Sequence, residues 1–140
     1  MRAALTPRTK AVIAVHLFGN VAPVPEIEAL GVPVLSDSAQ AAGSTREGRR
    51  AGSFGTAATF SFFPSKNLGG FGDGGAIATS DDGVAESARM LRFHGSTDKV
   101  TYEHVGYNSR LDEMQAAVLR VLLPEPVSYT HLTLPTTPYV

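Results

Sequence analysis

The residues best placed to do chemistry lie in one stretch, Thr59–Gly75, where a single lysine follows a β-prone run and precedes a glycine-dense loop. The alternation of Ala57–Phe63 predicts a strand, and Pro64 ends its regular pairing. Lys66 therefore lies where the strand gives way to the loop, as active-site residues often do. Its phenylalanine and glycine neighbours can exclude water from the amine, which favours the uncharged nucleophile. The alternative is a surface lysine beside a flexible turn.

Three other chemistries of this stretch are not supported. The run Gly70–Gly74 lacks the G-x-G-x-x-G spacing of a dinucleotide loop, and Ala76–Thr79 after it indicates a strand, not a helix. The stretch also lacks the Gly-Lys-Ser/Thr ending of a Walker loop. Ser61 lies outside any G-x-S-x-G motif, so a hydrolase nucleophile elbow is not indicated.

Composition excludes several classes of function. The chain has 140 residues, of which 43% are hydrophobic and 18% charged, typical of one globular domain. A formal net charge of -1 gives no electrostatic case for nucleic acid or a charged membrane surface, and no apolar run has membrane-spanning length. The chain has no cysteine and only scattered histidines, so we expect a cytoplasmic protein without a metal site.

The elements before this stretch predict a parallel sheet. The apolar run Ala11–Val15 indicates a strand buried on both faces, Pro23–Leu30 a short helix, and Val32–Leu35 a second strand. This βαβ spacing is typical of an α/β fold, in which ligands bind beyond the carboxyl ends of the strands. Asp37 is predicted at such an end. The alternative for Asp37 is a helix N-cap.

The later elements are predicted from turn and capping signals. Gly43–Gly55 is polar and indicates a solvated turn, while Gly75–Thr79 indicates a strand. Ser80, Asp81 and Asp82 are expected to cap a helix that Gly95 ends. A second helix is expected to start with a capping box at Ser109 and Asp112. The predicted apolar stripes are Val84, Ala88 and Leu91 on the first helix, and Leu111, Met114, Val118 and Leu122 on the second.

The chain divides at residue 123. Four prolines interrupt residues 124–140, and Val127–Val140 has no charged residue and no amphipathic order. We interpret 124–140 as a tail unrelated to the domain, translated from adapter or vector sequence. The alternative is a natural extended tail.

Residues 2 to about 123 resemble the sugar aminotransferases of the DegT/DnrJ/EryC1/StrS family. Four blocks in family order carry the resemblance: Ala14–Gly19, Asp37–Ala41, Thr59–Gly69 and Gly106–Ala117. The resemblance implies an α/β fold, namely the later half of the large domain of a fold-type I pyridoxal-phosphate transferase, over residues 1–123. The upstream segment that completes the phosphate cradle and the small C-terminal domain are expected to be missing.

The resemblance also implies roles for five residues. Lys66 matches the lysine that forms a Schiff base with pyridoxal phosphate, and Asp37 matches the partner of the pyridine nitrogen. Gln40 matches a contact to the cofactor ring, and Ser61 a ligand of its phosphate. Asn108 matches a residue that reaches the phosphate in the neighbouring subunit, which implies a homodimer. His16 and Arg110 lie in matching blocks but are interpreted as structural.

Lys66 also distinguishes the aminotransferases of this family from the related sugar dehydratases, which carry histidine in its place. Lys66 therefore favours transamination of a nucleotide-linked keto sugar with an amino donor such as glutamate. A fragment of such an enzyme is expected to be inactive alone. The alternatives are a non-catalytic small-molecule binding module and an inactive structural fragment.

Overall fold

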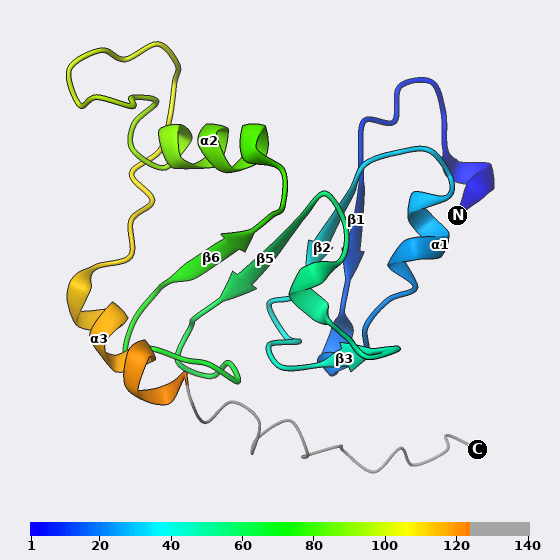
Figure 1. Cartoon of the computed structure of the whole chain (residues 1–140), viewed down its shortest axis with the longest axis horizontal. Coiled ribbons are helices and arrows are strands. Elements are labelled where there is room, and N and C mark those ends of the chain that lie inside the picture. Colours follow the sequence, from blue (N-terminus) through cyan, green and yellow to red (C-terminus); the bar gives the residue numbers. More distant parts are fainter. Residues whose placement is uncertain (124–140) are drawn as a thin grey trace.

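A four-stranded sheet runs through the protein (Figure 1). The structure is a computed structural model that describes residues 1–123; the predicted tail 124–140 lies outside the described residues. The strands, in their order across the sheet, are β1 (Val12–Val15), β2 (Val34–Asp37), β5 (Ala57–Ser61) and β6 (Gly75–Ala78). β1, β2 and β5 are parallel, and β6 is antiparallel to β5. The predicted parallel α/β arrangement is therefore confirmed, with β5 shorter than expected.

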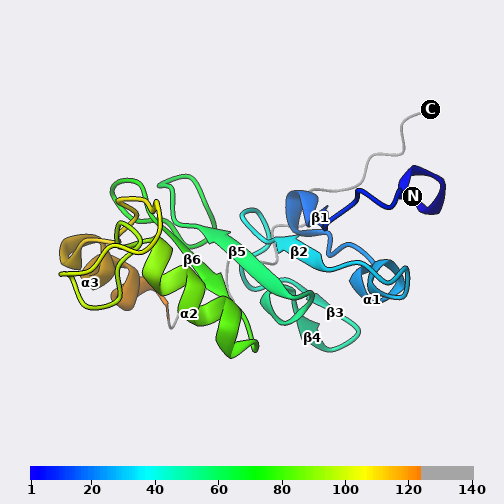
Figure 2. The ribbon, with the colours of Figure 1, turned by 90° about the horizontal axis from the view of Figure 1, so that it is seen from above.

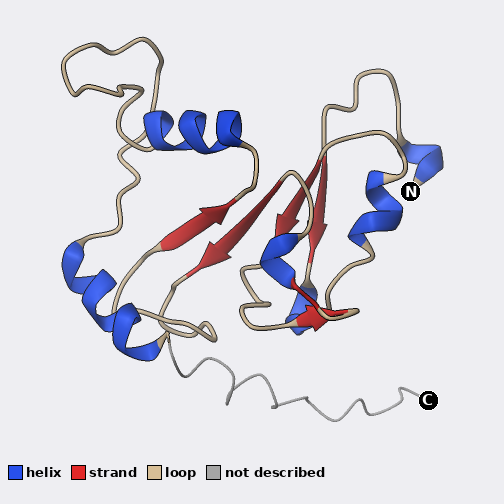
Figure 3. Cartoon of the chain, in the orientation of Figure 1, coloured by secondary structure: helices blue, strands red, loops and turns tan. Residues whose placement is uncertain are grey.

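Three α-helices flank the sheet (Figure 3). They are α1 (Val24–Glu28), α2 (Asp82–Leu91) and α3 (Glu113–Leu122). α2 begins at Asp81, whose carboxylate accepts a hydrogen bond from the Val84 N–H, as its sequence predicts. α3 begins at Asp112, which accepts from the Gln115 N–H. The predicted capping box starting at Ser109 is therefore wrong, because Asp112 itself is the N-cap.

The sheet has one covered face and one open face. Ala14, Ser36 and Ala58 lie in register across three strands and are at most 5% exposed, which defines the covered face. The next row, Val15, Asp37, Thr59 and Ile77, points to the opposite side, because side chains alternate along a strand. On this open face Val15 is 49% and Ile77 58% exposed. The prediction that Ala11–Val15 is buried on both faces is therefore wrong for this chain.

The hydrophobic core lies between the covered face and α1. Val24 and Ile27 of α1 pack with Ala14 and Val34 of the sheet. Helix α1 and the hairpin of β3 (Thr45–Arg46) and β4 (Arg49–Arg50) lie on the same side of the sheet (Figure 2). The cluster thus takes its residues from segments on both sides of β2 in the sequence.

The segment 43–55 contributes to this core, which corrects its prediction as a solvated turn. After the β3–β4 hairpin, the 3-10 helix η3 (Ala51–Ser53) and Phe54 turn inward, leaving Ala51 1% and Phe54 3% exposed. The Arg49 guanidinium lies 4.3 Å from the Phe54 ring centroid. Arg49, one of the arginines that make the segment look solvated, therefore covers a buried aromatic ring.

Helix α3 buries a different stripe from the predicted one. Leu119 is 7% exposed, whereas Met114 is 80% and Leu122 42% exposed; Leu111 and Val118 are half-buried. Gln115 of the helix and Leu111, just before the helix, contact the β5–β6 loop, whereas Met114 is exposed.

None of the helices within residues 1–123 has the length and hydrophobicity that a membrane-spanning helix requires.

Candidate active site

The carboxyl ends of the parallel strands bring two predicted site residues to one face. Asp37 ends β2 and lies in register with Thr59 of β5. Ser61 ends β5 two residues further on, so its side chain shares the open face with Asp37. The Ser61 hydroxyl oxygen accepts a hydrogen bond from the Phe63 N–H at 3.3 Å, which leaves its proton free to donate.

Asp37 is oriented by its own turn. Its Oδ1 accepts a hydrogen bond from the Ala39 N–H at 3.0 Å, and the Ser38 N–H donates to the Thr59 carbonyl at 2.8 Å. Turns and not a helix follow Asp37, so the N-cap alternative is wrong. Within residues 1–123 the second carboxylate oxygen has no hydrogen-bond partner, so one oxygen is fixed and the other can bind a donor.

Lys66 is half-buried in the turn that follows β5. Its backbone N–H donates to the Phe63 carbonyl at 2.9 Å. The amide nitrogen of Asn67 donates to the Ala42 carbonyl at 3.5 Å, which joins the lysine turn to the loop after Asp37. Among the described residues, the Lys66 amine forms no hydrogen bond or ion pair. The two loops that carry the amine and the carboxylate therefore meet at the carboxyl edge of the sheet.

Gln40 connects this edge to the loop after β1. Its Oε1 accepts a hydrogen bond from the Phe18 N–H at 3.0 Å. Phe18 lies in the 3-10 helix η2 (Leu17–Gly19) with a φ of 53°, a conformation that a bulky residue rarely adopts. The backbone of Gly19, with a φ of 81°, passes close to Ser44, and its Cβ would lie 3.1 Å from the Ser44 hydroxyl oxygen. Gln40 thus holds a strained turn next to Asp37.

His16 lies beneath the same edge and is completely buried. Its Nδ1 accepts a hydrogen bond from the Ala22 N–H at 3.2 Å, which places the ring proton of the neutral imidazole on Nε2. Burial lowers the pKa of His16 below 6.5, although the nearby Asp37 charge acts in the opposite direction. A neutral imidazole inside the covered face fits the interpretation of His16 as structural.

Asn108 does not join the other four predicted site residues. It lies after the loop that follows α2, and its Oδ1 accepts a hydrogen bond from Arg110 Nε at 2.9 Å. It lines a broad groove of about 1010 Å³ with Arg89, Arg92 and Arg110, above residues of β5 and β6. Neither Asp37, Gln40, Ser61 nor Lys66 lines this groove. Asn108 therefore lies in a groove with three arginines that the other four residues do not line.

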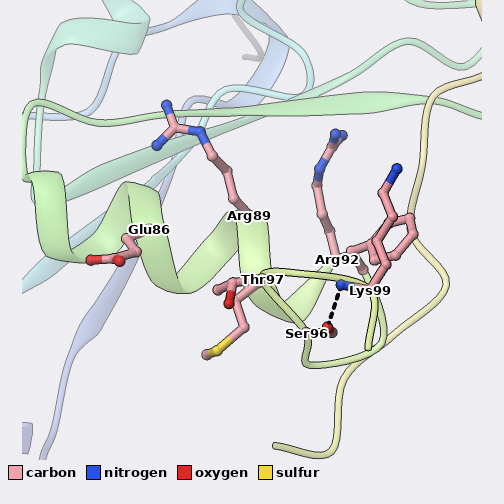
Figure 4. Close-up of a pocket in the computed structure, with 8 residues that line it drawn as sticks. Glu86, Arg89, Arg92, Ser96, Thr97 and Lys99 are labelled. Carbon is pink, nitrogen blue, oxygen red and sulfur yellow. Dashed lines mark hydrogen bonds between the residues drawn. The ribbon is translucent and has the colours of Figure 1, made fainter. Parts of the chain in front are cut away.

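A smaller cavity of about 320 Å³ lies where α2 gives way to its following loop (Figure 4). The Lys99 backbone N–H donates to the buried Ser96 hydroxyl at 2.9 Å. Asp98 Oδ1 accepts from the Val100 and Thr101 N–H groups at 2.8 and 2.7 Å. These bonds lower the pKa of Asp98 to about 2; the bond from Thr101 has the largest effect and the bond from Val100 the next largest. The hydrogen bonds of this loop are therefore made within the loop itself, and none of Asp37, Gln40, Ser61 and Lys66 lines the cavity.

The structure also identifies residues that sequence patterns did not single out. The buried Ser36 and Ser38 hydroxyls and His16 Nε2 have no hydrogen-bond partner in residues 1–123. Gln115, from α3, contacts the glycine loop after Lys66. A contact 44 residues apart leaves no local sequence signal. The part of the chain that the structure describes contains no cluster of three metal-ligating side chains.

Curated relatives cover most of this chain. It is 52% identical over 128 residues to a pleiotropic regulatory protein of Geobacillus stearothermophilus, covering 89% of the chain and 34% of that protein. It is 50% identical over 133 residues to the UDP-N-acetyl-3-dehydro-alpha-D-glucosamine 3-aminotransferase of Acidithiobacillus ferrooxidans, covering 92% of the chain and 36% of that protein. It is 52% identical over 124 residues to the dTDP-3-amino-3,4,6-trideoxy-alpha-D-glucose transaminase of Streptomyces venezuelae, covering 86% of the chain and 33% of that protein. The chain therefore spans about a third of the length of these relatives.

Solved structures share the fold. DesV of S. venezuelae, crystallised with a ketimine intermediate, superposes with a TM-score of 0.86 at 50% identity and covers 91% of this chain, which covers 35% of DesV. The mostly parallel α/β sheet is thus that of pyridoxal-phosphate aminotransferases, and this chain holds part of it. The model of the DegT/DnrJ/EryC1/StrS aminotransferase family matches residues 1–126, and the chain belongs to this family.

Proposed function

We propose that the full-length parent of this chain is a pyridoxal-phosphate-dependent aminotransferase. Its acceptor would be a nucleotide-linked keto sugar and its donor an amino acid such as glutamate. The names of two relatives, a UDP-sugar aminotransferase and a dTDP-sugar transaminase, support the substrate class. Because the chain spans about a third of those relatives, the proposal assigns residues 1–123 to the later half of the cofactor-binding large domain and the complete activity to the parent.

The observation that carries the proposal is the meeting of the lysine and aspartate loops at one edge. The Asn67–Ala42 hydrogen bond links them, and Asp37 and Ser61 share the open face. The donor set fits pyridoxal phosphate, which supplies an aldehyde for an amine and a ring that accepts electrons when its nitrogen is protonated. Asp37 offers the carboxylate for that nitrogen, Ser61 a hydroxyl for the phosphate, and Lys66 the amine.

Each residue has a defined task in this proposal. Lys66 would hold the cofactor through its amine, and Nζ, once freed, would carry a proton between the substrate carbon and C4′ of the cofactor. Asp37 keeps a proton on the ring nitrogen through its free oxygen, while the Ala39 N–H fixes the other. Gln40 supports the edge through Phe18 and has its amide NH₂ group to offer to the ring region.

Asn108 is proposed to serve a second copy of the parent. Lys66 does not line the groove that contains Asn108, which agrees with a residue that reaches the cofactor phosphate of a neighbouring subunit. Arg110 Nε holds the Asn108 oxygen, so the amide NH₂ group is the part left to donate to a phosphate. The proposed parent is therefore a homodimer with shared sites.

Trapping the cofactor tests the proposal. The 140-residue chain is mixed with pyridoxal phosphate, reduced with borohydride and digested, and the modified lysine is located by mass. Lys10 and Lys99 are internal controls, since they are the other two lysines of the sequence. We expect labelling confined to Lys66, absent in Lys66→Arg and reduced in Asp37→Asn.

Equal labelling of all three lysines, or none, would contradict a formed site in this chain. The parent protein separates the remaining explanations. Selective labelling of the equivalent lysine in the parent alone would mean that the chain is an inactive fragment. Failure in both would favour the non-catalytic binding module or the structural fragment.

A further inference from the structure

The glycine loop that follows Lys66 folds back on the strand that precedes it. The Gly70 N–H donates to the Phe62 carbonyl at 2.8 Å, and the Phe62 N–H donates to the Gly74 carbonyl at 2.7 Å. The loop from 62 to 74 therefore begins and ends on one residue. Lys66 lies inside this closed loop, with its own N–H bonded to the Phe63 carbonyl.

The backbone of the loop touches the turn that carries Lys66. A Cβ built on Gly69 would lie 2.6 Å from the Pro64 carbonyl oxygen and 2.9 Å from that of Phe63. These distances are below any normal contact, so the Gly69 backbone lies directly against the two carbonyls just before the lysine. The glycine segment and the lysine turn are therefore in direct contact.

Gln115 holds this glycine segment from outside. Its Oε1 accepts a hydrogen bond from the Phe71 N–H at 2.7 Å. A Cβ on Gly70 would lie 2.7 Å from the same oxygen, and one on Gly72 3.4 Å from Nε2, so both ends of the amide group lie close to the loop. Asp112 caps the Gln115 N–H at 2.8 Å, which fixes the helix turn from which the side chain extends. Figure 1 shows α3 beside the β5–β6 loop.

We propose that Gln115 is a positioning residue for Lys66. It acts through Phe71 and the glycine segment, and it makes the start of α3 part of the support of the lysine turn. The glutamine supplies an acceptor for one backbone N–H and leaves the glycines room to pack. The catalytic role of Lys66 rests on the proposed function. The link between Gln115 and the lysine turn does not depend on that function.

Amide hydrogen exchange on the full chain tests the link without any cofactor. Gln115→Met keeps the length of the side chain but removes the acceptor. We expect exchange to become roughly tenfold faster at the Phe71, Gly70 and Lys66 amides, the effect of losing about one net hydrogen bond. Gln115→Glu retains an acceptor oxygen and should restore protection. Arg120→Met, at an exposed position of the same helix, is the matched control and should leave these amides unchanged.

The chemistry of the lysine gives a second readout. Acetic anhydride is used to acylate the three lysines in competition, and the rate at half-buried Lys66 is divided by the rates at exposed Lys10 and Lys99. We expect this ratio to rise several-fold in Gln115→Met and to return in Gln115→Glu, following the loss and recovery of the hydrogen bond.

Two results would overturn the proposal. Faster exchange at Phe71 alone, with Lys66 unchanged in both exchange and acylation, would limit the bond to a local contact. Faster exchange throughout α3, for example at the Ala116 and Leu123 amides, without rescue by Gln115→Glu would make Gln115 a residue of helix stability only. Failure of pyridoxal phosphate to label Lys66 would leave both readouts intact, so it would count against the proposed function alone.

Discussion

His16→Gln should remove a specific part of the dependence of stability on pH. In the native protein the imidazole is completely buried and neutral, with Nδ1 accepting from the Ala22 N–H. Protonation would break that bond and place a charge in the covered face. Glutamine can offer Oε1 to the same N–H and cannot gain a proton. The substitution therefore removes the titration while keeping an acceptor.

The sign follows from the lowered pKa of His16. Burial brings this pKa below 6.5 despite the Asp37 charge, which acts in the opposite direction. Between the folded pKa and 6.5 the unfolded chain binds more protons than the native chain, so stability rises with pH. The contribution is fully present above 6.5 and is lost as the pH falls through this window. One proton limits the slope to about 1.4 kcal/mol per pH unit.

Urea unfolding measured at several values from about pH 5 to pH 8 provides the assay. Above the window His16→Gln should be less stable than the native chain by about 1–2 kcal/mol, because packing around the ring is lost. This difference should shrink on acidification, since only the native chain pays the protonation cost. His104→Gln, at an exposed histidine, is the control and should keep the native slope. Equal slopes for the native chain and His16→Gln would refute the reasoning.

Two further perturbations test local geometry. Gly55 has a φ of 78°, and a Cβ there would lie 2.5 Å from the Val34 carbonyl oxygen, so Gly55→Ala should lower the free energy of unfolding by about 2–4 kcal/mol in urea titrations. Gly31 has a similar φ of 81°, but a Cβ there would meet no other atom, so Gly31→Ala should lower the free energy of unfolding by only about 1–2 kcal/mol. Equal losses for the two variants would exclude the contact with Val34 as the cause of the larger loss at Gly55. Asp98 should keep its loop ordered until acid reaches its lowered pKa: the contribution is present above 3.8 and is lost as the pH falls through about 2. The chemical shifts of the Val100 and Thr101 amides should report this midpoint, and a midpoint at 3.8 would contradict the two bonds to Asp98.

The sequence predicted correctly those helices and strands that are determined by residues close to one another in the chain. Asp81 caps α2 as expected, because a carboxylate three residues before a free N–H needs no distant partner. The βαβ spacing predicted the parallel pairing of β1 and β2, and hence the position of Asp37 at a carboxyl end. The resemblance to the family added the roles of the site residues, which remain predictions.

The remainder depends on contacts that no local pattern contains. The exposed side of α3 also contains apolar residues, Met114 and Val121, while Gln115 on another side contacts the β5–β6 loop. Phe54 follows a run of arginines but becomes buried because the hairpin folds under the sheet. Ile13 lies in a run typical of a fully buried strand, yet it is 64% exposed because nothing in residues 1–123 covers that face.

The two outer strands have a consequence for how copies of this chain behave toward each other. In the described sheet β1 pairs only with β2 and β6 only with β5, so each has one side of unpaired backbone groups. Neither four-residue strand contains a charged or proline residue of the kind that blocks edge-to-edge addition. At high concentration the chain should therefore add strands between copies and aggregate through β-pairing, and its refolding yield should fall as concentration rises.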